Sequence, residues 1–152
     1  MTRNRCKLYF LLSLFIYFIY VIIVLINKQY DTLEKFNFLF ILLTIFLCSA
    51  IVYLSFSSAC KTGNFSALAG YSPKKNYNME VLGEMVEIIN GMIQLHTLLF
   101  SIIIFVISAF GFMTSYLMSA ALLFYIADFV FIILYLNYKY KDKLFKKPND
   151  IN

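Results

Sequence analysis

The sequence predicts an all-α integral membrane protein with four transmembrane helices. Four long apolar runs fill most of the 152-residue chain, at residues 8–26, 38–56, 92–113 and 116–136. A helix of about 20 apolar residues crosses a hydrocarbon core of roughly 30 Å. With 62% hydrophobic and only 14% charged residues, the composition is not that of a soluble domain. In lipid a helix satisfies its own backbone hydrogen bonds, so each run is expected to be helical.

The basic residues are sorted to one side of these four runs. Eleven of the 13 precede the first run, lie between the second and third, or follow the fourth. Lys28 and Lys35 lie between the first and second runs, and none lies between the third and fourth. Because basic residues collect on the cytoplasmic side, we expect both termini to be cytoplasmic and the helices to form two antiparallel pairs. The membrane thus accounts for the net charge of +5, and we expect no nucleic-acid partner.

We expect a single membrane domain over residues 1–152, retained in the bacterial plasma membrane as a multi-pass protein. The first run has a basic start, but residues 27–30 offer no small-residue cleavage site, so it is interpreted as an anchor and not a signal peptide. Short external segments are expected at 27–37 and 112–115. The cytoplasmic segment 57–91 is expected to be a loop up to residue 78 and an amphipathic helix thereafter. The lysine-rich tail, 137–152, is interpreted as an interfacial anchor.

Three glutamates, Glu80, Glu84 and Glu87, recur at helical spacing after a plausible N-cap, Asn78. Gly91 and Gln94 extend this stripe, and we predict one helix from residue 79 to about 111. The stripe is expected to face the cytoplasm or a partner chain. A solvated helix face is the preferred interpretation, and a cation site or an acid–base pair is the alternative.

Asp128 lies near the middle of the fourth run, where an ionisable residue costs about 2.5–3.5 kcal/mol on insertion scales. If the last two runs form a tight hairpin, Asp128 lies at the depth of Leu99. Thr97 and Ser101 are then within one turn of that depth, and a contact with the single histidine, His96, is feasible. A hydrogen bond that joins the two helices is the preferred interpretation. A proton relay or coupling site is the alternative.

The sequence contains no catalytic motif. GxSxG, HExxH and Gly-rich phosphate loops are absent. The three cysteines, Cys6, Cys48 and Cys60, show neither CxxC nor Cys/His metal spacing and are interpreted as plain thiols. No metal and no cofactor are expected, and we expect no enzymatic activity.

The cytoplasmic stretch 61–72, followed by Tyr77 and Asn78, resembles the Ala-Gly-Tyr-Asn-Thr-like loop of small, mostly uncharacterised bacterial membrane proteins. More loosely, Gly70, Tyr71 and Pro73 resemble the Gly-Tyr-Arg-Thr-Pro-like loop of immunity proteins of the sporulation-delaying-toxin type. The arginine of that pattern is missing here, and the chain has no tryptophan. The second resemblance implies protection against a membrane-active peptide.

Two classes of function follow. The first is a non-enzymatic membrane protein that acts by binding, with immunity to a membrane-active peptide or bacteriocin as its specific form. The second is a small transporter, channel subunit or proton-coupled component that uses Asp128 and His96. The expected partners are the lipid bilayer and another membrane protein or a toxin peptide, and the oligomeric state stays open.

Overall fold

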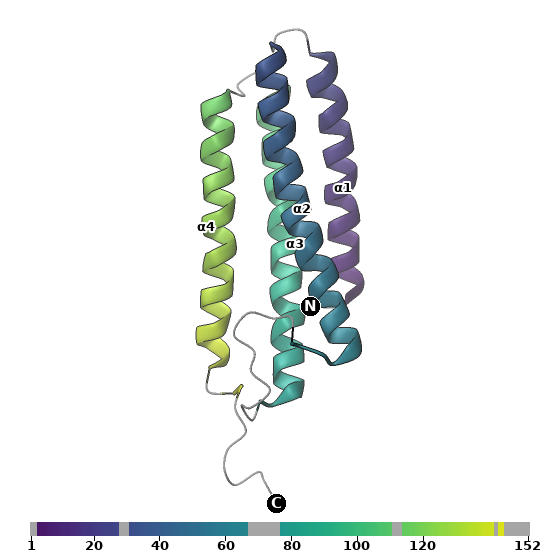
Figure 1. Cartoon of the computed structure of the whole chain (residues 1–152), viewed down its shortest axis with the longest axis vertical. Coiled ribbons are helices and arrows are strands. Elements are labelled where there is room, and N and C mark those ends of the chain that lie inside the picture. Colours follow the sequence, from purple (N-terminus) through teal and green to yellow (C-terminus); the bar gives the residue numbers. More distant parts are fainter. Residues whose placement is uncertain (1–2, 28–30, 67–76, 111–113, 142, 145–152) are drawn as a thin grey trace, which may run out of the picture.

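The computed structural model shows the chain as four long helices (Figure 1). It describes residues 3–27, 31–66, 77–110, 114–141 and 143–144. Helix α1 spans Arg3–Ile26, α2 spans Thr32–Thr62, α3 spans Met79–Ala109 and α4 spans Ser115–Tyr140. Each helix is long and apolar enough to cross a membrane. The predicted all-α class, with four helices long and apolar enough to span a membrane, is therefore confirmed.

The helix ends do not coincide with the ends of the apolar runs. Helix α1 starts at Arg3 rather than at residue 8, and α4 continues to Tyr140, into the predicted tail. Helix α2 includes residues 32–37 and 57–62, which the sequence predicts to lie in loops. Backbone capping decides where a helix ends, and polar turns of helix are free to extend into the lipid headgroup region.

Local capping accounts for both ends of α2. At its start, Asp31 Oδ1 accepts a hydrogen bond from the Glu34 backbone N–H at 2.7 Å, and Glu34 Oε2 accepts one from the Asp31 N–H at 3.3 Å. This reciprocal capping box satisfies two backbone donors of the first turn. At its end, Gly63 adopts the left-handed conformation with φ +66°, which glycine adopts without a steric penalty.

The prediction of one long helix from residue 79 is also correct. Helix α3 is continuous from Met79 to Ala109, and Asn78 caps it by accepting a hydrogen bond from the Val81 backbone N–H. Residue 111, the predicted end, lies outside the described residues. The third apolar run and the amphipathic segment before it therefore form a single element.

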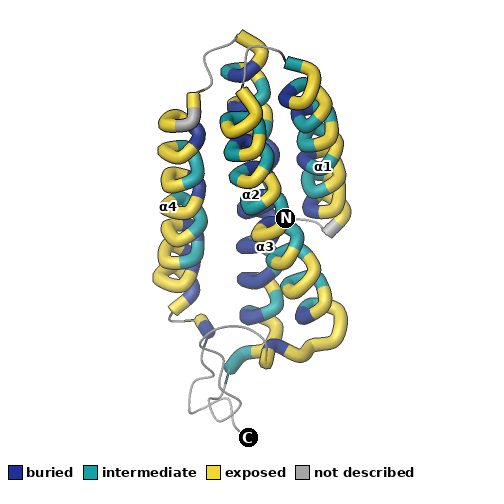
Figure 2. Tube along the Cα trace, turned by 45° about the horizontal axis from the view of Figure 1, so that its top comes forward, coloured by how far each residue is buried: buried dark blue, intermediate teal, exposed yellow. Residues whose placement is uncertain are grey.

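Helices α2 and α3 form the centre of the bundle. Each of them packs against all three other helices, whereas α1 and α4 make no contact with each other in the described parts of the chain. Figure 1 shows α1 and α4 on opposite sides, with successive helices running in opposite directions. Figure 2 shows buried positions on the inward sides and exposed ones around the outside. The exposed apolar side chains are suited to lipid.

Two clusters of buried side chains fill the bundle. One lies toward the end where α1 joins α2 and includes Tyr20, Val24, Phe38, Leu42, Ile45, Ile104, Met118 and Tyr125. The other lies toward the end where α2 joins α3 and includes Ala59, Phe65, Leu82, Met85, Val86, Ile89, Ile93, Ile132, Leu136, Tyr140 and Leu144.

The second cluster includes residues from outside the helices. Phe65 follows α2 and Leu144 follows α4, and both are buried. The Asn78 backbone N–H also donates to the Leu144 carbonyl at 2.8 Å, which joins the start of α3 to the chain after α4. The tail was expected to be a polar anchor from residue 137, but the spacing of Ile132, Leu136, Tyr140 and Leu144 continues the packed side of α4 into it.

Candidate functional site

The polar side chains in the membrane-spanning part of α3 lie mainly on its inward side. Asn90, Gln94 and Thr97 are buried, and Ser101 is half-buried. Steps of four, three and four residues keep them on one side of a helix. The sequence predicts that Gly91 and Gln94 extend the glutamate stripe, which faces the cytoplasm or a partner chain, but both residues are buried within this chain. That assignment is wrong beyond Glu87, because α3 enters the bundle centre there.

Gln94 joins α3 to α2. Ser49 Oγ donates to Gln94 Oε1 at 2.9 Å, and Gln94 Nε2 donates to the Ser49 carbonyl at 3.1 Å. Both side chains are completely buried. Two turns of α2 further on, Asn90 Nδ2 donates to Ser57 Oγ at 3.3 Å. Asn90 Oδ1 is buried and has no hydrogen-bond partner among the described residues.

Thr97 joins α3 to α4. Its hydroxyl lies 2.8 Å from the Tyr125 hydroxyl and also donates to the Ile93 carbonyl at 2.8 Å. The Tyr125 hydroxyl is therefore the donor of the bond between the two helices. Ser101 Oγ donates to the Thr97 carbonyl at 2.8 Å, within α3. Of these two candidate residues, only Thr97 reaches a neighbouring helix through a hydrogen bond.

A second bond between α3 and α4 joins the two ionisable candidates. His96 Nδ1 lies 2.5 Å from Asp128 Oδ2. The contact that the hairpin argument made feasible is present. It lies at the edge of the bundle and not in its interior, because the His96 side chain is 36% exposed and that of Asp128 is 29% exposed. The preferred interpretation, a hydrogen bond between the helices, fits the geometry, but the bond is not fully buried.

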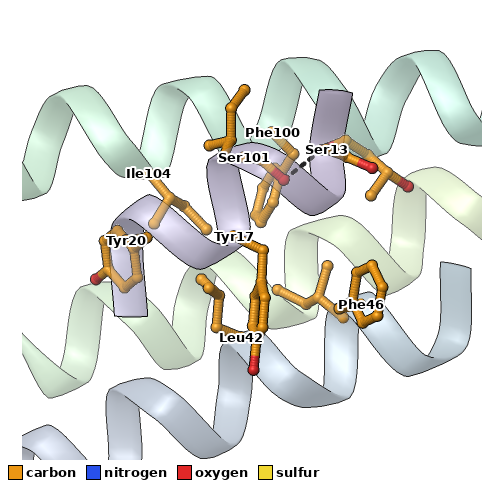
Figure 3. A pocket seen from close by; sticks show the side chains of 11 residues that line it. Ser13, Tyr17, Tyr20, Leu42, Phe46, Phe100, Ser101 and Ile104 are labelled. Carbon is orange, nitrogen blue, oxygen red and sulfur yellow. Dashed lines mark hydrogen bonds between the residues drawn. The ribbon is translucent and has the colours of Figure 1, made fainter. Parts of the chain in front are cut away.

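A small cavity lies between α1, α2 and α3. Its volume is about 20 Å³, which is enough for about one water molecule. Figure 3 shows Ser13, Tyr17 and Tyr20 of α1 around it, together with Phe100, Ser101 and Ile104 of α3. Ser13 Oγ donates to the Phe10 carbonyl, so this hydroxyl, like that of Ser101, is bonded to its own helix. The cavity is too small for an organic ligand.

Comparisons with known proteins assign no family. No protein-family model, no curated protein and no solved structure matches this chain. The function is therefore inferred from the arrangement of its residues.

The remaining candidates are not assembled into a reactive centre in the part of the chain that the structure describes. No three His, Cys, Asp or Glu side chains are grouped there as metal ligands. Glu80 and Glu84 are exposed and Glu87 is half-buried, and the solvated helix face stays the preferred interpretation. Cys6, Cys48 and Cys60 all lie in described helices and form no disulfide bond. Gly70, Tyr71 and Pro73 of the family-like loop lie outside the described residues.

Sequence reasoning missed the partners Ser49, Ser57 and Tyr125. A lone serine in an apolar run is common and carries little signal by itself. Tyr125 carried a stronger signal, because it precedes Asp128 by three residues and therefore lies close to the same side of α4. If Asp128 is level with Leu99, Tyr125 is level with Ile102, which is five residues or about one and a half turns from Thr97.

Proposed function

We propose that this protein is a non-enzymatic, multi-pass protein of the bacterial plasma membrane that acts by binding another membrane-embedded molecule. The observation that carries the proposal is that the interior polar side chains hydrogen-bond to one another between helices. Ser49 with Gln94, and Thr97 with Tyr125, hydrogen-bond across helix interfaces, and Asn90 reaches Ser57 in the same way. Such bonds fix helix packing in lipid. The hydroxyls of Ser49 and Thr97 bond to an amide oxygen, a backbone carbonyl and a phenol, and not to a carboxylate or an imidazole.

The proposed orientation places both termini in the cytoplasm, with α1 and α2, and α3 and α4, as antiparallel pairs. It is supported by the position of 11 of the 13 basic residues on one side. In this orientation the exposed glutamates Glu80 and Glu84 face the cytoplasm. A binding partner on the outer side meets only short connections, so recognition takes place mainly within the membrane.

The specific form that we propose is immunity to a membrane-active peptide or bacteriocin. It is supported by the resemblance of the Gly70-Tyr71-Ser72-Pro73 stretch to immunity proteins and by the four compact spans. The test is to express the chain in a sensitive bacterium and to measure survival against membrane-active peptides. Protection that falls with Tyr71→Ala but not with the exposed-site control Asn64→Ala supports the proposal. Unchanged sensitivity at normal protein levels contradicts the immunity form.

The binding proposal itself is tested by pull-down from the organism's own membranes. We expect a membrane-embedded peptide or protein to be recovered reproducibly with the tagged chain, and not with an unrelated four-helix membrane protein of similar abundance. Recovery of lipid alone contradicts the proposal.

A proton-coupled component or transporter is the second candidate, and one observation favours it. His96 and Asp128 form a pair of ionisable groups at the edge of the bundle, with both side chains partly exposed. Intramembrane ionisable groups commonly mark ion or proton pathways. Neutralising Asp128 distinguishes the two candidates, because only the second needs a titrating carboxylate.

A further inference from the structure

The His96–Asp128 pair lies deep in the membrane-spanning part of the chain. Asp128 is 13 residues after the start of α4 at Ser115 and 12 before its end at Tyr140. At 1.5 Å per residue, it is about 18–20 Å from either end of the helix. Lysine and arginine can extend their charged groups to the membrane surface, but the short side chain of aspartate cannot. The pair must therefore be satisfied at its own depth.

The contact between the two side chains leaves part of their hydrogen-bonding capacity unused. His96 Nδ1 and Asp128 Oδ2 bond to each other, whereas His96 Nε2 and Asp128 Oδ1 make no hydrogen bond with any described residue. The side chains are 36% and 29% exposed on the outside of the bundle. Polar groups that face hydrocarbon without a partner are costly, so a further partner at this position is favoured.

The chemistry of the pair indicates what kind of partner fits. Hydrocarbon favours the form of the pair without net charge, which holds two protons, one between Nδ1 and Oδ2 and one on Nε2. In that form Nε2–H is a donor and Oδ1 is an acceptor, whichever of Nδ1 and Oδ2 holds the proton between them. The exposed side of the pair therefore presents one donor beside one acceptor. Such a surface is complementary to a second copy of itself.

Symmetry makes this match possible within a membrane. Two copies related by a twofold axis along the membrane normal place every residue at the same depth as its counterpart, and use the same surface on both chains. We propose that a second copy of this chain docks on the α3–α4 face, with His96 Nε2–H of each copy donating to Asp128 Oδ1 of the other. The four side chains then close a ring in which each of these atoms has a partner.

The apolar side chains around the pair allow close approach of a helix bundle. Leu99 and Ile103 on α3, with Phe124 and Phe131 on α4, are exposed on the same sides of their helices as His96 and Asp128. Apolar contact alone gives little preference for protein over lipid, since lipid tails are equally apolar. The polar ring therefore selects both the partner and the register.

Cysteine cross-linking in native membranes tests the proposal. Phe124→Cys and Phe131→Cys are one turn on either side of Asp128, in a Cys48→Ala background that removes an exposed native thiol. The matched control is Phe15→Cys, an exposed phenylalanine in the middle of α1, on the opposite side of the bundle. We expect a product of twice the chain mass, several-fold more abundant at 124 or 131 than at 15. Equal yields at all three positions overturn the proposal, as does a product of any other mass.

Variants of the pair test whether it holds the two copies together. Asp128→Asn keeps an acceptor oxygen and should retain the cross-link, whereas Asp128→Leu and His96→Phe should lower it to the level of the Phe15→Cys control. Protein level and a monodisperse profile in mild detergent establish that each variant is folded. If either Asp128→Leu or His96→Phe does not accumulate in the membrane, the cross-link of the other variant tests the proposal. A cross-link that persists unchanged in a folded variant overturns the proposal. The readout is association alone, so it is independent of peptide protection.

Discussion

Gln94 and Ser49 form two hydrogen bonds with each other across the α2–α3 interface. One runs from the Ser49 hydroxyl to the Gln94 amide oxygen, and the other from the Gln94 amide nitrogen to the Ser49 carbonyl. Neither side chain has any exposed surface. Because the second bond uses the backbone of α2, the register between the central helices depends on the side chain of Gln94.

Gln94→Leu should destabilise the bundle more than Ser49→Ala does. The leucine removes both bonds and leaves the Ser49 hydroxyl without its partner, and a buried unsatisfied group costs about 1–3 kcal/mol. The alanine leaves the bond to the Ser49 carbonyl in place. Unfolding of the two single variants and the double variant in detergent micelles measures their coupling, which averages about 0.6 kcal/mol for hydrogen bonds in membrane proteins. A coupling of zero would show that the pair contributes nothing to stability.

Two glycine substitutions should have opposite effects. Gly63→Ala places a side chain at φ +66°, a left-handed conformation that costs about 1–2 kcal/mol for an L-residue. Gly83→Ala lies inside α3, where the added methyl would be 3.8 Å from Phe65 Cζ, an ordinary contact, and alanine favours helix by about 1 kcal/mol. Thermal denaturation followed by circular dichroism should show a lower midpoint for the first and a higher one for the second. The reverse order would contradict both assignments.

Labelling from either side of the membrane should establish the orientation. Asp31→Cys lies just before α2 and Ser66→Cys shortly after it, and both positions are exposed. In a Cys48→Ala background, a membrane-impermeant thiol reagent added to intact cells should modify Asp31→Cys only. Permeabilised cells should show modification at both positions. External labelling of Ser66→Cys would invert the proposed orientation.

Asp128→Asn separates the binding function from proton coupling. Asparagine has nearly the shape of aspartate and can still hydrogen-bond to His96, but it cannot titrate. On the binding proposal, protein level and peptide protection should remain within about twofold of wild type, a difference of under 0.5 kcal/mol. Survival assays and immunoblots of the same cultures measure both. A folded, abundant variant without activity would show that the charge is needed, and would favour the proton-coupled alternative.

The fold was predictable to the extent that it depends on hydrophobic length. Four apolar runs require four helices in lipid, and the structure has them. The helix ends were less predictable, because capping by Asp31, Asn78 and Gly63 acts independently of hydropathy. The loop assigned to residues 57–62 was wrong for this reason. The burial of Leu144 was also missed, since two adjacent apolar residues, Leu144 and Phe145, among lysines give little signal in composition.

Contacts in the candidate site were predictable only where the depth of a residue in the membrane restricts which residues can be its partners. His96 and Asp128 could be related because the short connection between α3 and α4 fixes which residues share a level. Ser49 could not be related to Gln94 in this way. The long segment between α2 and α3 leaves their relative register open, and a serine in an apolar run does not indicate which side of the helix it occupies. Long-range pairing of small polar residues therefore needed the structure.

The packing of α3 against both α1 and α2 has a consequence for how the protein is made. During synthesis, α1 and α2 are made before α3, so Ser49 and Ser57 enter the membrane before their partners Gln94 and Asn90 have been synthesised. The first two helices must therefore remain in the bilayer without these bonds until α3 is inserted. Most contacts between helices join one of the first two helices to one of the last two. The fragments 1–66 and 77–152, produced as separate chains, should therefore associate without a covalent link.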